Sequence, residues 1–105
     1  MRIYLSGKIT GDKNYIEKFK IFEEGLRELY PDAVIINPVI IGKRVEKHNK
    51  NPEWIDYMKP CIEKLRTCTH IFMLPDWRES KGAIYEHATA KSLGLKVLVY
   101  GNIIN

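Results

Sequence analysis

The residue best suited to chemistry is Glu86, because its position in an expected helix does not suit a charged side chain. Small and apolar residues repeat at helical spacing from Ala83 to Leu93, and Glu86 falls between Ala90 and Leu93 at the edge of that inward-facing stripe. The residues three and four positions away include no cation and are small, which leaves space above the carboxylate. A partly buried carboxylate beside a void is what the nucleophilic carboxylates of glycosyl-transferring enzymes require. A tertiary salt bridge to a distant Lys or Arg is the alternative.

Two loops are candidates for binding a substrate near this carboxylate. Residues 6–11, Ser-Gly-Lys-Ile-Thr-Gly, contain two glycines that permit close backbone approach and a lysine suited to a phosphate, although a plain strand-to-helix turn uses glycine as well. Residues 75–83 run into a helix N-terminus, whose free amides bind anions or sugar hydroxyls. Ser80 there also suits a simple N-cap, and Trp77 suits either base stacking or core cover. The candidate binding residues of the two loops are Ser6, Gly7, Lys8, Gly11, Trp77, Ser80 and Gly82.

The elements that must position these residues follow from the hydrophobic pattern. Short β-branched and aromatic runs predict strands, and apolar residues at helical spacing predict helices between them. Residues 39–52 show no clear period and are expected to form a long mobile connection or a substrate-covering loop. The predicted strands are 2–5, 33–36, 70–74 and 96–100, and the predicted helices are 15–29, 54–68 with a kink or first turn at Pro60, and 80–94.

Strands that alternate with helices predict an α/β fold. We expect a Rossmann-like or flavodoxin-like three-layer sandwich, with a mostly parallel sheet of four to five strands covered on both faces. The 105 residues suffice for one hydrophobic core, so residues 1–105 are expected to form a single domain. Ligands of such folds bind beyond the carboxyl ends of the strands, which is where both candidate loops lie.

The net charge of +4 favours an anionic partner such as a nucleotide. Much of the basic charge lies at Lys43, Arg44, Lys47 and Lys50, within the segment expected to be a loop. No aromatic residues interleave with these bases, as single-stranded nucleic acid would require, so a solvated loop is preferred and no nucleic-acid partner is expected.

The apolar segments and the two cysteines indicate the cellular location and the absence of a metal site. The chain shows no secretory signal and no apolar run of membrane-spanning length, so we expect a cytoplasmic protein with no membrane partner. Cys61 and Cys68 lie seven positions apart on one helical face, and no Cys/His pair has zinc-ligand spacing. Reduced core cysteines and no metal site are therefore predicted.

Several motifs together resemble the nucleoside 2-deoxyribosyltransferase superfamily. They are Ile-Tyr-Leu-Ser-Gly at residues 3–7, Ser-x-Gly-Ala-x-x-Glu at residues 80–86, and Ala90 with Gly94. The resemblance spans nearly the whole chain and is nearest to small phage and bacterial members, which share the opening, an Asn-Pro after the second strand and a Pro-x-Trp before the serine. The chain is also similar to the deoxynucleoside 5′-monophosphate N-glycosidases.

The resemblance implies an enzyme of nucleotide metabolism that transfers or hydrolyses the N-glycosyl bond of a nucleoside or nucleoside 5′-monophosphate. It maps the nucleophile onto Glu86, the phosphate- or sugar-binding pair onto Ser80 and Gly82, and the base and sugar pocket onto Tyr4 and Gly7. Glu86 would form a covalent 2-deoxyribosyl ester that water or a second base resolves with retention. The resemblance implies no metal or organic cofactor. It does imply a homodimer or a larger homo-oligomer.

The sequence departs from the family pattern at two positions. Cys61 stands where relatives commonly carry an aspartate, and a thiol is a poor acid near neutral pH. Asp76 is the candidate catalytic substitute by position. Thr10 stands where the monophosphate N-glycosidases have an arginine, which favours a free nucleoside unless Lys8 or Arg78 contacts the phosphate.

Two other functions remain open from the sequence. The first is a catalytically silent nucleotide-binding or regulatory module, in which Glu86 only hydrogen-bonds a ribose. The missing aspartate favours this module, whereas the complete set of serine, glycine and glutamate favours the enzyme. The second, weaker alternative is a nucleic-acid-binding accessory protein that uses the basic segment around Arg44.

Overall fold

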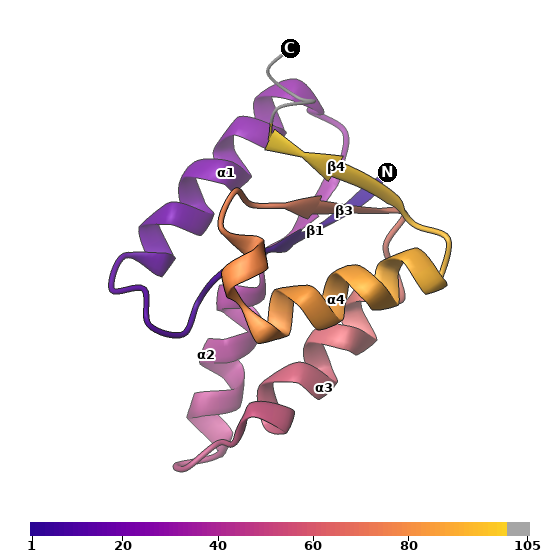
Figure 1. Ribbon diagram of the computed structural model, residues 1–105. Helices are drawn as coiled ribbons and strands as arrows, with labels where there is room; N and C mark the ends of the chain where they lie inside the picture. The colour runs from indigo at the N-terminus through magenta and orange to yellow at the C-terminus, as the bar shows by residue number, and fades with distance from the viewer. Residues whose placement is uncertain (101–105) are drawn as a thin grey trace.

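The chain alternates strands and helices in the computed structural model, which describes residues 1–100. This alternation confirms the predicted α/β class, and the predicted strands and the helices that begin near residues 15, 54 and 80 are all present. The elements are β1 (Arg2–Ser6), α1 (Tyr15–Leu29), β2 (Val34–Ile36), α2 (Pro38–His48), α3 (Trp54–Leu65), β3 (His70–Met73), the 3₁₀ turn η1 (Trp77–Glu79), α4 (Lys81–Ser92) and β4 (Lys96–Val99) (Figure 1).

The sheet has four strands within residues 1–100, all parallel, in the order β2-β1-β3-β4. In the register of the sheet, Ile3 of β1 lies between Ile35 of β2 and His70 of β3. The chain moves from β1 to β2 on one side and then crosses back over β1 to β3. The strand order therefore reverses between β1 and β3, and ligands of open parallel sheets bind at the carboxyl ends of the strands at such a point.

Helices cover both faces of the sheet and complete the three-layer sandwich. Figure 1 shows α1 on one side and α3 with α4 on the other, while α2 extends away from the carboxyl ends of the strands. Successive residues of β1 point to opposite faces. Ile3 and Leu5 pack with Phe19 and Leu26 of α1, whereas Tyr4 faces the side of α3 and α4. The buried residues that surround Tyr4 include Ile41, Cys61, Leu65, Ile71, Ala83 and Ala90.

The ends of α4 follow the local rules that the sequence indicated. The Ser80 side chain accepts a hydrogen bond of 3.1 Å from the backbone N–H of Ala83, so Ser80 is the N-cap. Gly94 follows the helix with φ +79°, a left-handed conformation that glycine adopts without steric cost. These two residues set the length of α4 and place Glu86 on its second turn.

The prediction of a loop over residues 39–52 is wrong for residues 39–48, because Pro38–His48 form α2, and residues 49–52 connect α2 to α3 outside any helix or strand. Asn37-Pro38 follows the strand and also begins this helix, because the Asn37 side chain accepts a 3.0 Å hydrogen bond from Val39 N–H and Pro38 occupies the first turn. Of the apolar residues in α2, Pro38, Val39 and Ile41 are buried. A helix that buries so short a stretch shows little apolar periodicity, which is why the pattern did not reveal it.

Gly7 is required where the loop after β1 passes the loop after β3. A Cβ at this position would lie 2.8 Å from Cβ of Leu74 and 3.2 Å from Oδ1 of Asp76, both too close for ordinary packing. We expect Gly7→Ala to lower the free energy of unfolding by about 1 to 3 kcal/mol, measured by urea denaturation.

Gly25 offers a matched control for Gly7. It lies inside α1, and a Cβ there would have no neighbour within 4 Å. Gly25→Ala is therefore expected to raise the free energy of unfolding by about 0.5 to 1 kcal/mol. If Gly7→Ala were as stable as the unmodified protein, the close approach of the two loops would be refuted.

Candidate functional site

Glu86 lies at the centre of the candidate site, with 5% of its surface exposed. One carboxylate oxygen accepts a 2.5 Å hydrogen bond from the Tyr4 hydroxyl, and the other accepts a 2.7 Å hydrogen bond from Oγ of Ser6. Both donors come from β1, at alternate positions on the face that α4 covers. No Lys or Arg within residues 1–100 pairs with this carboxylate, so the tertiary salt bridge is not what holds it there. The carboxylate is oriented by two neutral hydroxyl groups.

Burial dominates the electrostatics of this group. It raises the pKa of Glu86 to about 7, although the hydrogen bonds from Tyr4 and Ser6 favour the charged form and oppose the shift. Burial, together with the neighbouring Glu86 charge, also raises the pKa of Tyr4 well above its ordinary value. Tyr4 therefore stays protonated and remains a hydrogen-bond donor across the physiological range, while Glu86 exchanges its proton near neutral pH.

A cavity of about 530 Å³ opens above Glu86, within the size range of small-molecule sites. Its walls come from the loop after β1, from α2, from α3 and from the beginning of α4. Three aromatic side chains, those of Tyr15, Trp54 and Tyr57, line it. Aromatic side chains and a buried carboxylate that line the same cavity suit a ligand that has a flat ring and a polar reacting centre.

The structure brings most of the predicted site residues together. Gly7, Gly11, Ser80, Gly82 and Glu86 line the cavity, and Tyr4 and Ser6 support Glu86 from the sheet. The backbone of Gly82 passes close to α3, since a Cβ there would lie 3.2 Å from Sδ of Met58.

Sequence reasoning missed the wall that α2 contributes, including Val39, Gly42 and Lys43. The signal for this wall was present in Asn37-Pro38, which is a helix start as well as a strand end. It also missed the aromatic side chains of Tyr15 and Tyr57. Their place in the cavity depends on how α1 and α3 sit against the sheet.

Cys61 lines the cavity from α3 and lies in the environment of Tyr4 and Glu86. Burial, followed by the Glu86 charge, raises the pKa of the Cys61 thiol to about 12. A thiol with so high a pKa keeps its proton at neutral pH, so it is neither a useful acid nor a nucleophile. Both Cys61 and Cys68 are free thiols.

Asp76 is placed outside the cavity and is engaged in a cluster around Lys18. The Lys18 ammonium donates to the Asp76 carboxylate at 2.6 Å, to Asp12 at 2.5 Å and to the backbone carbonyl of Lys8 at 2.6 Å. The other Asp76 oxygen accepts the Lys8 N–H at 3.1 Å. Burial disfavours the charged form of Lys18, but its acidic partners outweigh this effect and raise its pKa. The structure thus assigns Asp76 to fixing the loop after β1.

Trp77 and Lys8 also lie apart from Glu86. The Trp77 ring packs against His87, with centroids 4.4 Å apart, and the Arg78 guanidinium lies 4.7 Å from the Trp77 ring centroid. Trp77 borders a separate depression, together with Leu74 and Pro75, and is not among the residues that line the cavity above Glu86. The ammonium of Lys8 lies 3.7 Å from the Glu79 carboxylate. The predicted binding roles of Trp77 and Lys8 therefore find no support in their positions.

Among residues 1–100, no group of three or more His, Cys, Asp or Glu side chains is arranged to hold a metal ion. No helix in the same range is long and apolar enough to cross a membrane. The cytoplasmic location and the homo-oligomer stay predictions.

The fold and the site define an α/β domain with a buried carboxylate in a cavity at the strand-order reversal of a parallel sheet. The chain belongs to the family DUF4406, a domain of unknown function, which matches residues 1–99. No curated protein and no solved structure matches the chain.

Proposed function

We propose that this protein cleaves or transfers the N-glycosidic bond of a 2-deoxyribonucleoside or its 5′-monophosphate, with Glu86 as the nucleophile. The observation that carries the proposal is the Glu86 carboxylate itself, which is buried in the wall of a ligand-sized cavity and held by two hydroxyl donors. A carboxylate without a cationic partner is costly to bury, and a catalytic role accounts for that cost.

In the proposed reaction, one Glu86 oxygen attacks the anomeric carbon of the deoxyribosyl group. A carbon–oxygen ester bond forms, the carbon–nitrogen bond breaks, and the base leaves with the bonding electrons and takes up a proton. Water or a second base then displaces Glu86 from the same carbon, so that the configuration is retained. Tyr4 and Ser6 hold the carboxylate in one orientation throughout, which reduces the entropy lost on reaching the transition state.

The cavity walls suit the rest of such a substrate. Tyr15, Trp54 and Tyr57 offer aromatic surface to a base. Ser80 and Gly82 lie at the beginning of α4, where backbone amides can meet a sugar hydroxyl or a phosphate. A base, a sugar and the attacking carboxylate can thus be placed within one cavity.

The proton for the leaving base comes from solvent in this proposal. Cys61 keeps its proton because its pKa is about 12, and Asp76 is held by Lys18 outside the cavity. We therefore expect slow turnover, and faster reaction for bases that leave readily without a positioned acid, since general acid catalysis contributes about 10² to 10⁴-fold where it operates.

The protonated thiol of Cys61 favours a second candidate function, a nucleotide-binding module without catalysis. Within the cavity, a thiol stands where an acid would be useful, and burial keeps it protonated. In this case Glu86 would accept hydrogen bonds from a sugar hydroxyl. Thermal protection by nucleosides without any base release would favour the module.

The test is a panel of deoxynucleosides and their 5′-monophosphates incubated with the protein, with free base measured by chromatography. We expect release from at least one member and faster release when a second base is supplied, if transfer is the reaction. Glu86→Gln should lose this release, and Glu63→Gln is its matched control, because Glu63 is an exposed carboxylate on α3. Absence of release from every member, together with thermal protection by the same compounds, would contradict the proposal.

A further inference from the structure

Four basic residues form a ridge along α2 and its C-terminal end. They are Lys43, Arg44, Lys47 and Lys50, all exposed, and this segment contains one acidic residue, Glu46. Lys43 and Lys47 lie one helical turn apart, about 6 Å along the axis. The structure thus places Lys43, Arg44 and Lys47 on a helix where the sequence suggested a solvated loop, and Lys50 follows two residues after the end of that helix.

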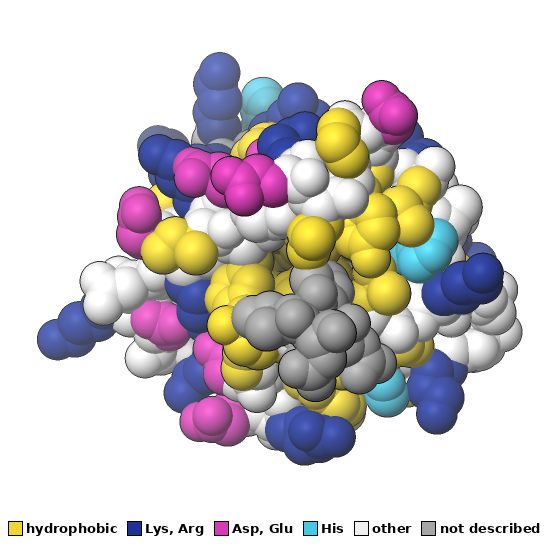
Figure 2. All heavy atoms as spheres, turned by 90° about the horizontal axis from the view of Figure 1, so that it is seen from above, with side chains coloured by type: hydrophobic (Ala, Val, Ile, Leu, Met, Phe, Trp, Pro, Cys, Tyr) yellow, Lys and Arg dark blue, Asp and Glu magenta, His cyan; other side chains and the backbone are white. Residues whose placement is uncertain are grey.

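The α2 ridge keeps an excess of positive charge, because its four cations stand beside one acidic residue in the segment, Glu46. Within residues 1–100, none of its four side chains takes part in a salt bridge. Glu46 accepts a 2.9 Å hydrogen bond from the Tyr57 hydroxyl, and Asp56 accepts the Glu53 N–H at 2.8 Å in the capping box of α3. By contrast, Lys and Arg side chains are scattered around the face shown in Figure 2, several of them beside Asp or Glu.

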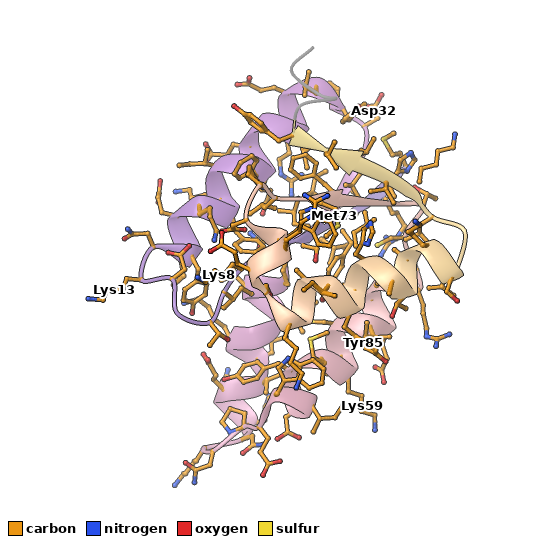
Figure 3. All side chains as sticks on the ribbon, in the orientation of Figure 1. Lys8, Lys13, Asp32, Lys59, Met73 and Tyr85 are labelled. Atoms are coloured by element: carbon orange, nitrogen blue, oxygen red, sulfur yellow. The ribbon has the colours of Figure 1, made fainter. Side chains whose placement is uncertain are left out.

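The α2 ridge begins at the cavity and leads away from it. Lys43 lines the cavity, and α2 extends from the carboxyl ends of the strands toward its own far end (Figure 1). Tyr57, which also lines the cavity, is joined to α2 through Glu46. Glu46 also lines the cavity, and Lys13 extends away from the body of the protein (Figure 3), so the cations that lead outward from Lys43 are those of α2 and of the residues just after it.

We propose that the α2 ridge binds the sugar–phosphate backbone of a single-stranded nucleic acid, one nucleotide of which enters the cavity above Glu86. This inference rests on the proposed function and names its substrate class. A free nucleoside carries no phosphate, and a monophosphate needs only a cation near the cavity. Four cations on α2 and just after it, beginning at the cavity, match a chain of phosphates better than a single one. A single strand is required because a base must leave the duplex stack to reach a buried carboxylate.

The inference reverses the sequence-based expectation of no nucleic-acid partner. That expectation depended on the absence of aromatic residues among the Lys and Arg residues of positions 43–50. The tertiary structure supplies the aromatic surface from other elements, with Tyr15 before the ridge in the chain and Trp54 and Tyr57 after it. Stacking surface and positive charge therefore meet at the cavity although they are separated in the sequence.

The test measures binding of a fluorescently labelled single-stranded deoxyoligonucleotide by anisotropy over a range of salt concentrations. The variant Arg44→Gln/Lys47→Gln/Lys50→Gln leaves Lys43 and the cavity intact. Each lost phosphate contact lowers the slope of log K against log salt by about 0.7, so we expect a slope smaller by about 2 and at least about tenfold weaker binding at low salt. Base release from free deoxynucleosides should be unchanged, and release from the oligonucleotide should fall.

The matched control is Lys20→Gln/Lys64→Gln/Lys91→Gln, which removes three exposed lysines from α1, α3 and α4. An equal loss of binding in this control would show general charge attraction and overturn the inference. So would ridge-dependent binding to phosphatidylserine vesicles without oligonucleotide binding. Release of base from free nucleosides without oligonucleotide binding would refute nucleic-acid binding by the ridge and leave the proposed function standing. Ridge-dependent binding without release of base from any substrate supports the ridge and counts against the proposed function.

Discussion

Glu86→Gln is expected to reduce the rate of base release by at least about 10³-fold, because an amide cannot form the glycosyl ester. The glutamine has the same size and can still meet Tyr4 and Ser6, so the cavity should keep its shape. The measurement is the initial rate of base release on the preferred substrate, with substrate binding followed separately by thermal protection. Loss of rate with binding retained would place the effect on the chemical step.

Two comparisons make this result specific. Glu63→Gln, on the exposed side of α3, should leave the rate unchanged. In the unmodified protein, the rate should fall about tenfold for each pH unit below about 7, because only the ionised Glu86 carboxylate attacks. A glutamine variant that released base at the original rate would show that Glu86 is not the nucleophile and would favour the silent module.

The same substitution is expected to change how stability depends on pH. Burial raises the pKa of Glu86 from 4.5 to about 7 in the folded protein, so between these values the folded state binds more protons than the unfolded state. The free energy of unfolding contributed by this group therefore falls as pH rises through that window. Each pKa unit corresponds to about 1.4 kcal/mol, so the loss amounts to about 3 kcal/mol above pH 7.

Glu86→Gln lacks this titration. The free energy of unfolding of the variant, relative to that of the unmodified protein, should therefore rise by about 3 kcal/mol between pH 4.5 and pH 8. Urea denaturation of both proteins at several pH values measures the difference, in which the other titrating groups cancel. Glu63→Gln again provides the control for removing a carboxylate, because Glu63 is exposed on α3 and its substitution leaves the Glu86 carboxyl in place. Parallel curves for Glu86→Gln would mean that the Glu86 carboxyl titrates alike in both states.

The local pattern of the sequence determined most of the secondary structure and the place of Glu86. Short β-branched and aromatic runs and period-3.6 repeats extend over neighbouring residues only, so the four strands and the helices α1, α3 and α4 were predictable. The Ser80 cap and Gly94 fixed the ends of α4, and the repeat within that helix turned Glu86 inward. The helix α2 was missed because Asn37-Pro38 suits two structures and because the buried apolar residues of α2 are confined to its beginning, where they show no helical period.

Only the tertiary structure decided which residues meet at the site. Tyr4 and Ser6 reach Glu86 across 82 and 80 positions of sequence, because β1 lies at the middle of the sheet and α4 packs over it. Asp76 and Trp77 belong to the same loop as Ser80, yet Lys18 holds the first and His87 packs against the second. Residues adjacent in a loop can face different sides of a helix, and their partners come from distant elements. Strand order and helix packing, which no local repeat encodes, determined those partners.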